Sequence, residues 1–137
     1  GQNQQAEHYR ELARRINRAV MEKCFDAGRG VMADTPPLAS GTRTYSQHAN
    51  ILAVLTNAVP TAQQRLVLQK TMADTSLTQA TFYFKFYLFQ ALKKVGMADQ
   101  FLPQLAPWRT MLAQGLTTFA ENPEPVRSDC HAWSASP

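Results

Sequence analysis

The sequence predicts an all-α fold built from repeated helical hairpins. Apolar residues recur at steps of three and four through most of the chain, and no segment alternates with period two for long enough to predict a strand. Half-polar helical segments alternate with nearly uniformly apolar ones, as expected when outer and inner helices close around a common axis. An α/α toroid fits this order. An α-solenoid also fits, but the chain lacks the fixed repeat of about 34 to 45 residues that a solenoid shows.

The first helix is predicted over residues 6–27, where one apolar stripe should be buried, and glycines end it. After a proline-containing loop, a second helix is expected over residues 46–59 with Ser46 as its N-cap. This second helix has almost no charged face, so protein should enclose it on most sides. The stripe of the first helix consists of Tyr9, Leu12, Ala13, Ile16, Ala19, Val20 and Cys24.

The third and fourth helices repeat the alternation of polar and apolar character. A one-sided helix is predicted over residues 61–73, after Pro60. An apolar, aromatic-rich helix follows over about residues 78–95, and Gly96 is placed as its C′ residue after two lysines that favour a helix C-terminus.

The fifth helix should begin near Asp99 and run to about Gly115, with Pro103 in its first turn and Pro107 as a kink or restart. A loop follows, and the string SDCHAWSA is expected to open a sixth, third inner, helix. We expect that last stretch to be poorly helical without the rest of the ring.

Composition excludes several classes of function. The chain of 137 residues, 45% apolar and 18% charged, has the size and composition of one folded domain. Apolar stretches fall short of the ~20 residues that a bilayer span requires, and the N-terminus lacks the apolar region of a signal peptide. No membrane partner is therefore expected, and the compartment cannot be read from the sequence.

The net charge of +4 is concentrated before residue 30, where glutamates alternate with the arginines. This pattern is typical of a solvated helix face and does not predict nucleic-acid binding. Cys24 and Cys130 lie far apart, and the three histidines lack the spacing that places two metal ligands on one helix face. We expect free thiols, no metal and no cofactor.

Polar and aromatic residues gather where the inner helices begin. If these helices are parallel, the residues meet at one mouth of the ring, where aromatic planes could stack on a sugar and polar groups could bind its hydroxyls. The residues are Tyr45, Ser46, Gln47 and His48, then Thr81, Phe82 and Tyr83, then Glu121, Asp129, His131 and Trp133.

A family resemblance adds to this interpretation. It is carried by FYFKFYLFQALKKVGMADQFLPQLAPWRTMLAQGLTTFAE with SDCHAWSASP, and by YSQHANILAVLTNAVP. From about Tyr9 onward the chain resembles the late part of the catalytic domain of bacterial α-L-rhamnosidases, glycoside hydrolase family 78. The resemblance implies a six-hairpin (α/α)6 toroid, of which residues 1–137 form roughly half as a single partial, C-terminal domain. It also implies inverting hydrolysis of terminal α-L-rhamnosides, with a rhamnose-containing carbohydrate as the ligand.

The resemblance assigns roles to particular residues. The glutamate of the Thr-Thr-x-x-Glu stretch, Glu121, would be the general base, and His131 would contact the sugar. Trp133, Tyr45 and Gln47 would line the funnel. The family usually has an aromatic residue directly before this glutamate. Alanine stands there in this chain, which leaves Glu124 as a weaker competitor for the base.

An inverting glycosidase also needs a general acid, with the two carboxyl groups ~6.5 to 9.5 Å apart. The family's acidic motif lies upstream of this region and has no match here, so the isolated chain is expected to be inactive. It should also self-associate through uncovered apolar helices. Two alternatives stay open: a non-catalytic helical scaffold that binds a protein, and another sugar-cleaving toroid, such as a glucoamylase-like enzyme or a uronyl hydrolase.

Overall fold

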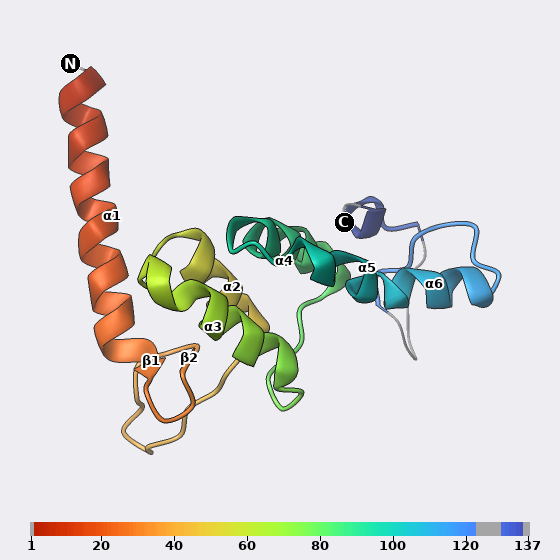
Figure 1. Ribbon diagram of the computed structural model, residues 1–137, viewed down its shortest axis with the longest axis horizontal. Helices are drawn as coiled ribbons and strands as arrows, with labels where there is room; N and C mark the ends of the chain where they lie inside the picture. The colour runs from red at the N-terminus through yellow and green to blue at the C-terminus, as the bar shows by residue number, and fades with distance from the viewer. Residues whose placement is uncertain (1, 123–129, 136–137) are drawn as a thin grey trace. The chain divides into compact units, whose positions relative to one another are not determined.

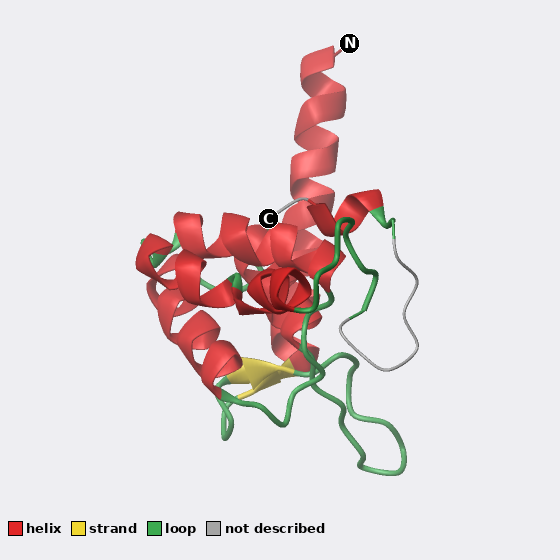
Figure 2. Cartoon of the chain, turned by 90° about the vertical axis from the view of Figure 1, so that its right-hand side faces the viewer, coloured by secondary structure: helices red, strands yellow, loops and turns green. Residues whose placement is uncertain are grey.

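The computed structural model describes residues 2–122 and 130–135, which fall into two compact units. Unit 1 comprises Gly1–Thr78 and unit 2 comprises Gln79–Pro137. Helices form most of the described chain, and its sheet structure is limited to one short hairpin (Figures 1 and 2). The predicted all-α class is confirmed.

Unit 1 begins with α1 (Gln2–Cys24), which ends before residue 27 because the chain turns back on itself. The strands β1 (Phe25–Asp26) and β2 (Val31–Met32) pair antiparallel. Between them the carboxylate of Asp26 accepts the backbone N–H groups of Gly28 and Arg29. Strands of two residues are too short for a period-two pattern to reveal, which is why the sequence did not predict them.

The apolar stripe of α1 corrects an expectation. Tyr9, Leu12 and Ile16 are 59%, 39% and 52% exposed, and Cys24 is the buried residue of this helix. The C-terminal half of α1 contacts the rest of unit 1: Asn17 Nδ2 donates to the carbonyl of Thr56 at 2.7 Å. Periodicity shows that a helix has a face suited to burial, but it cannot show that the covering element is present.

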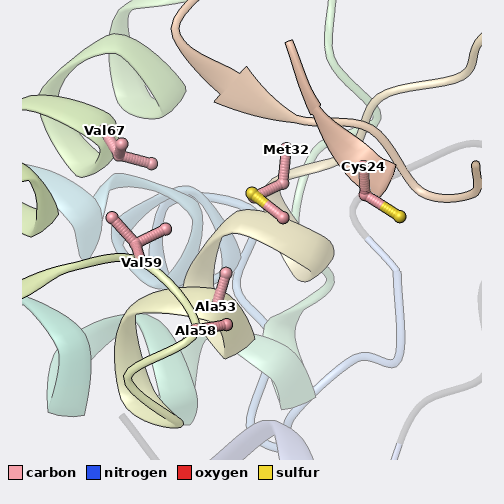
Figure 3. Close-up of a cluster of buried hydrophobic side chains, with 6 residues drawn as sticks. All are labelled: Cys24, Met32, Ala53, Ala58, Val59 and Val67. Atoms are coloured by element: carbon pink, nitrogen blue, oxygen red, sulfur yellow. The ribbon is translucent and has the colours of Figure 1, made fainter. Parts of the chain in front are cut away.

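The helices α2 (Gln47–Leu55) and α3 (Thr61–Ala73) pack together, and α3 has the predicted bounds. As predicted, Ser46 caps α2, its hydroxyl accepting the Ala49 N–H at 3.2 Å. The helix ends well before residue 59 because Asn57, at φ 62°, takes a left-handed conformation. Figure 3 shows the core cluster around this pair, which consists of Cys24, Met32, Ala53, Ala58, Val59 and Val67.

A buried amide connects the hairpin to α2. Asn50 is fully buried, and its Oδ1 accepts the Met32 N–H at 2.8 Å. Its Nδ2 donates to the carbonyls of Met32 at 3.1 Å and Ser46 at 2.8 Å. One side chain thus satisfies backbone groups that would otherwise be buried without partners.

Unit 2 opens with α4 (Phe82–Lys94), capped by Thr81, whose hydroxyl accepts the Phe84 N–H at 3.4 Å. The helix begins later than expected because this cap, rather than the start of the apolar pattern, sets its first turn. Gly96 follows at φ 70°, as the C′ prediction requires.

The predicted fifth helix is divided into η1 (Ala98–Gln100), α5 (Phe101–Gln104) and α6 (Ala106–Ala113). A break at Leu105 with Pro107 in the first turn of α6 confirms the predicted restart. The expected sixth helix is, in its described part, a single 3-10 turn, η2 (Ala132–Ala135).

The interior of unit 2 gathers where α4 and α6 begin. Phe82, Trp108, Met111 and Ala120 form its buried cluster, and the rings of Phe82 and Trp108 have centroids 5.1 Å apart. Because Ala120 is fully buried, the core also anchors the loop that follows α6.

Candidate functional site

A pocket of about 480 Å³ in unit 2 is the candidate site. Its volume lies within the ~300 to 1,000 Å³ typical of small-molecule sites. Among the described residues, the lining combines two aromatic rings, one carboxylate, one amide and two hydroxyls, one of them that of the tyrosine. These groups belong to Thr81, Tyr83, Glu121, Asn122 and Trp133.

Local structure explains how the lining is assembled. The cap at Thr81 sets the first turn of α4 and therefore the place of Tyr83, which is 48% exposed. Glu121 and Asn122 come directly after the buried Ala120. Trp133 comes from η2, the last described segment of the chain, and is 50% exposed.

His131 joins the two loop segments of the site. Its backbone N–H donates to the carbonyl of Phe119 at 2.9 Å, two residues before Glu121. Its Nε2 lies 3.7 Å from Glu121 Oε2, a distance that suits an ion pair when the imidazole is protonated but is long for a hydrogen bond. The His131 and Trp133 rings are 4.8 Å apart at 58°. Cys130, at φ 71°, directs the chain into this arrangement from a left-handed conformation that non-glycine residues rarely adopt.

The carboxylate and the imidazole differ in exposure. The Glu121 side chain is 43% exposed, whereas that of His131 is 18% exposed. Among the described residues, His131 Nδ1 is a buried nitrogen without a hydrogen-bond partner. A water-accessible carboxylate beside an imidazole and two aromatic rings can accept a proton from water and can hold a ring that carries hydroxyls.

Tyr45 and Gln47, also predicted as sugar-binding residues, belong to unit 1. The Tyr45 hydroxyl donates to Asp26 Oδ2 at 2.6 Å, and this bond is the main cause that lowers the pKa of the Asp26 carboxyl. The Arg29 guanidinium lies 4.1 Å from the Tyr45 ring centroid. Gln47 is buried in the first turn of α2, and its N–H donates to the carbonyl of Thr78. The structure therefore brings Glu121 and Trp133 together within unit 2, with His131 beside them.

Sequence reasoning did not name Asn122, and it placed Tyr83 among the residues expected at the mouth of the ring without giving it a binding role. Tyr83 also stands among aromatic residues that periodicity places in the core, and only its position at the start of the helix set it apart. Asn122 follows the proposed base and carried no signal of its own. Glu124 and Asp129 lie outside the described residues.

The described residues contain no group of three or more histidine, cysteine, aspartate or glutamate side chains that could hold a metal ion. Within the same part of the chain, no helix combines the length and apolar character of a membrane span. Cys24 and Cys130 are free thiols, the first buried and the second exposed.

Comparisons with known proteins identify the fold. The sequence model described as the bacterial alpha-L-rhamnosidase 6 hairpin glycosidase domain matches residues 1–137. A search of curated proteins finds no match. The six-hairpin helical fold expected from the sequence is thereby confirmed.

Two solved structures are similar to the chain. The rhamnosidase from Klebsiella oxytoca with rhamnose bound has a TM-score of 0.79 and 22% identity over 96% of this chain and 28% of its own. The glycoside hydrolase family 78 rhamnosidase of Bacillus sp. GL1 has a TM-score of 0.74 and 23% identity over 88% of this chain and 14% of its own. The chain thus spans less than a third of either protein, and at these identities the likeness concerns the fold.

Proposed function

Because the chain belongs to the bacterial α-L-rhamnosidase six-hairpin glycosidase family, we propose that it forms the C-terminal portion of an (α/α)6 catalytic domain that hydrolyses terminal α-L-rhamnosides. The Klebsiella oxytoca protein carries bound rhamnose, which supports a rhamnose-containing ligand here. The observation that carries the proposal is the pocket that Glu121 shares with two aromatic side chains, Tyr83 and Trp133.

In this proposal Glu121 is the general base of an inverting mechanism. Its carboxylate accepts a proton from a water molecule as the water oxygen bonds to the anomeric carbon, opposite the departing group. The bond from that carbon to the leaving oxygen breaks, and a separate acid protonates the oxygen. The exposure of the Glu121 side chain supports this role, because the base must reach water.

The neighbours of Glu121 supply binding. The rings of Trp133 and Tyr83 would cover the apolar face of the sugar, and the amide of Asn122 would bind a hydroxyl. His131 would contact the sugar through its imidazole, whose Nε2 lies 3.7 Å from Glu121 Oε2 and whose ring centroid lies 4.8 Å from that of Trp133. Roles for Tyr45 and Gln47 in the funnel stay predictions.

The general acid is proposed to lie outside residues 1–137. Among the described residues, Glu121 is the sole carboxylate that lines this pocket. We therefore expect the isolated chain to be inactive on an aryl α-L-rhamnoside that the complete enzyme cleaves. The exposed stripe of α1 supports the further prediction that the isolated chain self-associates.

The test is Glu121→Gln in the complete enzyme. Removing a general base should lower kcat by about 100- to 10,000-fold on an aryl α-L-rhamnoside. Asp99→Asn is the matched control, because Asp99 is exposed in η1 and lies outside the lining of the pocket; its kcat should not change. Unchanged hydrolysis by Glu121→Gln would remove the base assignment and favour a non-catalytic scaffold.

Three further measurements define the reaction. Proton NMR should show β-L-rhamnose as the first-formed product, whereas α-L-rhamnose would indicate retention of configuration. Azide should restore activity to Glu121→Ala, because this anion attacks without a base. A screen of other aryl glycosides would separate a rhamnosidase from another sugar-cleaving toroid.

A further inference from the structure

We propose that Trp108 is a positioning residue that holds η2, and with it Trp133, at the wall of the pocket, with His131 directly before this turn. Trp108 does not itself line that pocket. The inference rests on the proposed function, because it assumes that the pocket binds the sugar.

The indole of Trp108 is firmly anchored. It lies in the first turns of α6, is 9% exposed and packs on Phe82, the first residue of α4. The same buried cluster contains Met111 and Ala120, and Ala120 directly precedes the proposed base. The beginnings of two helices and the loop that carries Glu121 therefore meet around one side chain.

From this anchor the indole reaches η2. Trp108 Nε1 donates to the carbonyl of Ser134 at 2.6 Å, within the interior of unit 2. The Ser134 hydroxyl is buried and has no hydrogen-bond partner among the described residues. The backbone of Ser134, and not its side chain, is thus the point of attachment.

The turn is held at both ends. At its start the His131 N–H donates to the Phe119 carbonyl at 2.9 Å, and at its end Ser134 accepts the indole bond at 2.6 Å. Within the turn the Ser134 N–H also donates to the His131 carbonyl at 3.1 Å. Trp133 lies between the two attachments, with half of its surface exposed.

A turn of four residues has little rigidity of its own. Without the indole bond, the His131–Phe119 bond and the packing of η2 against α4 would remain, and the orientation of the Trp133 and His131 rings would be less fixed. The substrate would then have to order these rings on binding, which weakens binding more than it slows the chemical step.

The test is Trp108→Phe in the complete enzyme, which keeps an aromatic ring against Phe82 and removes the N–H donor. We expect KM for an aryl α-L-rhamnoside to rise about tenfold, while kcat falls less than about threefold. The matched control Ser134→Ala leaves the accepting carbonyl in place and should not change KM. A lower Tm with unchanged KM in Trp108→Phe would overturn the proposal, because a merely structural residue behaves in that way.

A double-mutant cycle tests whether Trp108 acts through Trp133. In a Trp133→Ala background, Trp108→Phe should raise KM clearly less than tenfold, because His131 is then the one ring of the two that is left to be positioned. A full tenfold effect in that background would contradict the mechanism.

If Trp108→Phe does not fold, benzothienylalanine at position 108 keeps the two-ring shape without the N–H group and should produce the same rise in KM. An unchanged KM in that variant would likewise overturn the proposal. A failure of the proposed function and a failure of this inference give different results. Full activity of Glu121→Gln removes the proposed function. Loss of activity in Glu121→Gln, together with an unchanged KM in Trp108→Phe, removes only the role of Trp108.

Discussion

The two units use their polar side chains differently. In unit 1 they bind one another and the backbone: Asn50 satisfies Met32 and Ser46, and Tyr45 donates to Asp26. In unit 2, polar groups near the pocket are exposed to solvent or lack a hydrogen-bond partner among the described residues. Glu121 is exposed, and a nitrogen of His131 and the hydroxyl of Ser134 are buried without partners among the described residues. Polar groups that are already paired stabilise a fold, whereas an exposed group that lines a pocket, such as the Glu121 carboxylate, can serve a ligand.

The loops of unit 1 show this pairing most clearly. Arg29 Nη2 donates to Asp74 Oδ2 at 2.6 Å and to Ser76 Oγ at 3.1 Å, while its guanidinium lies over the Tyr45 ring. Lys70 Nζ donates to the Arg29 carbonyl at 3.3 Å. One arginine thus connects the β1–β2 turn, the loop after α3 and the residue that precedes the N-cap of α2.

The largest effect on stability is expected for Asn50→Ala. The change deletes three hydrogen bonds and leaves the buried N–H and C=O of Met32 without partners. We expect the free energy of unfolding to fall by about 3 kcal/mol, measured by urea denaturation. Asn17→Ala, which removes a single bond to Thr56 on the surface, should cost about 1 kcal/mol or less. An equal loss of unfolding free energy in Asn50→Ala and Asn17→Ala would contradict the expected difference between buried and exposed hydrogen bonds.

A smaller, pH-dependent effect is expected for Tyr45→Phe. The Tyr45 hydroxyl lowers the pKa of Asp26 below its usual value of 3.8, so this bond stabilises the fold above that pH. The contribution is lost as pH falls through the lowered pKa, because the carboxyl is then protonated in both states. Thermal unfolding should therefore show a Tm a few degrees lower in the variant at pH 7, and no difference well below the lowered pKa. A rise in KM in the complete enzyme would instead place Tyr45 in substrate binding.

The smallest effect is expected for Ser134→Ala. Ser134 and Asn50 are both fully buried, but the Ser134 hydroxyl has no partner among the described residues. Its removal should change the free energy of unfolding by less than about 0.5 kcal/mol, or raise it slightly. A loss above about 1 kcal/mol in urea denaturation would show that the hydroxyl is bonded, and it would weaken the comparison of the two units.

Sequence reasoning succeeded where the signal is local. Ser46 caps α2, α3 has its predicted bounds, and the proline in the first turn of α6 restarts the helix. It failed where distant residues decide the outcome. The β1–β2 hairpin and the exposed stripe of α1 depend on partners that periodicity does not contain.

The candidate site divides in the same way. Residue type and motif singled out Glu121, His131 and Trp133, and the structure groups them. No local pattern indicated that Tyr83 would face the pocket while its neighbour Phe82 enters the core, or that Trp108 would bond to the backbone of η2.

By itself, the sequence determined the helical class, the bounds of α3, the cap of α2 and the family. Caps, prolines and apolar spacing act within a few residues, and a motif is read from the chain directly. The tertiary structure alone decided which polar groups are paired and which line a pocket. That outcome depends on contacts between residues far apart in the chain, such as Tyr45 with Asp26 and Trp108 with Ser134.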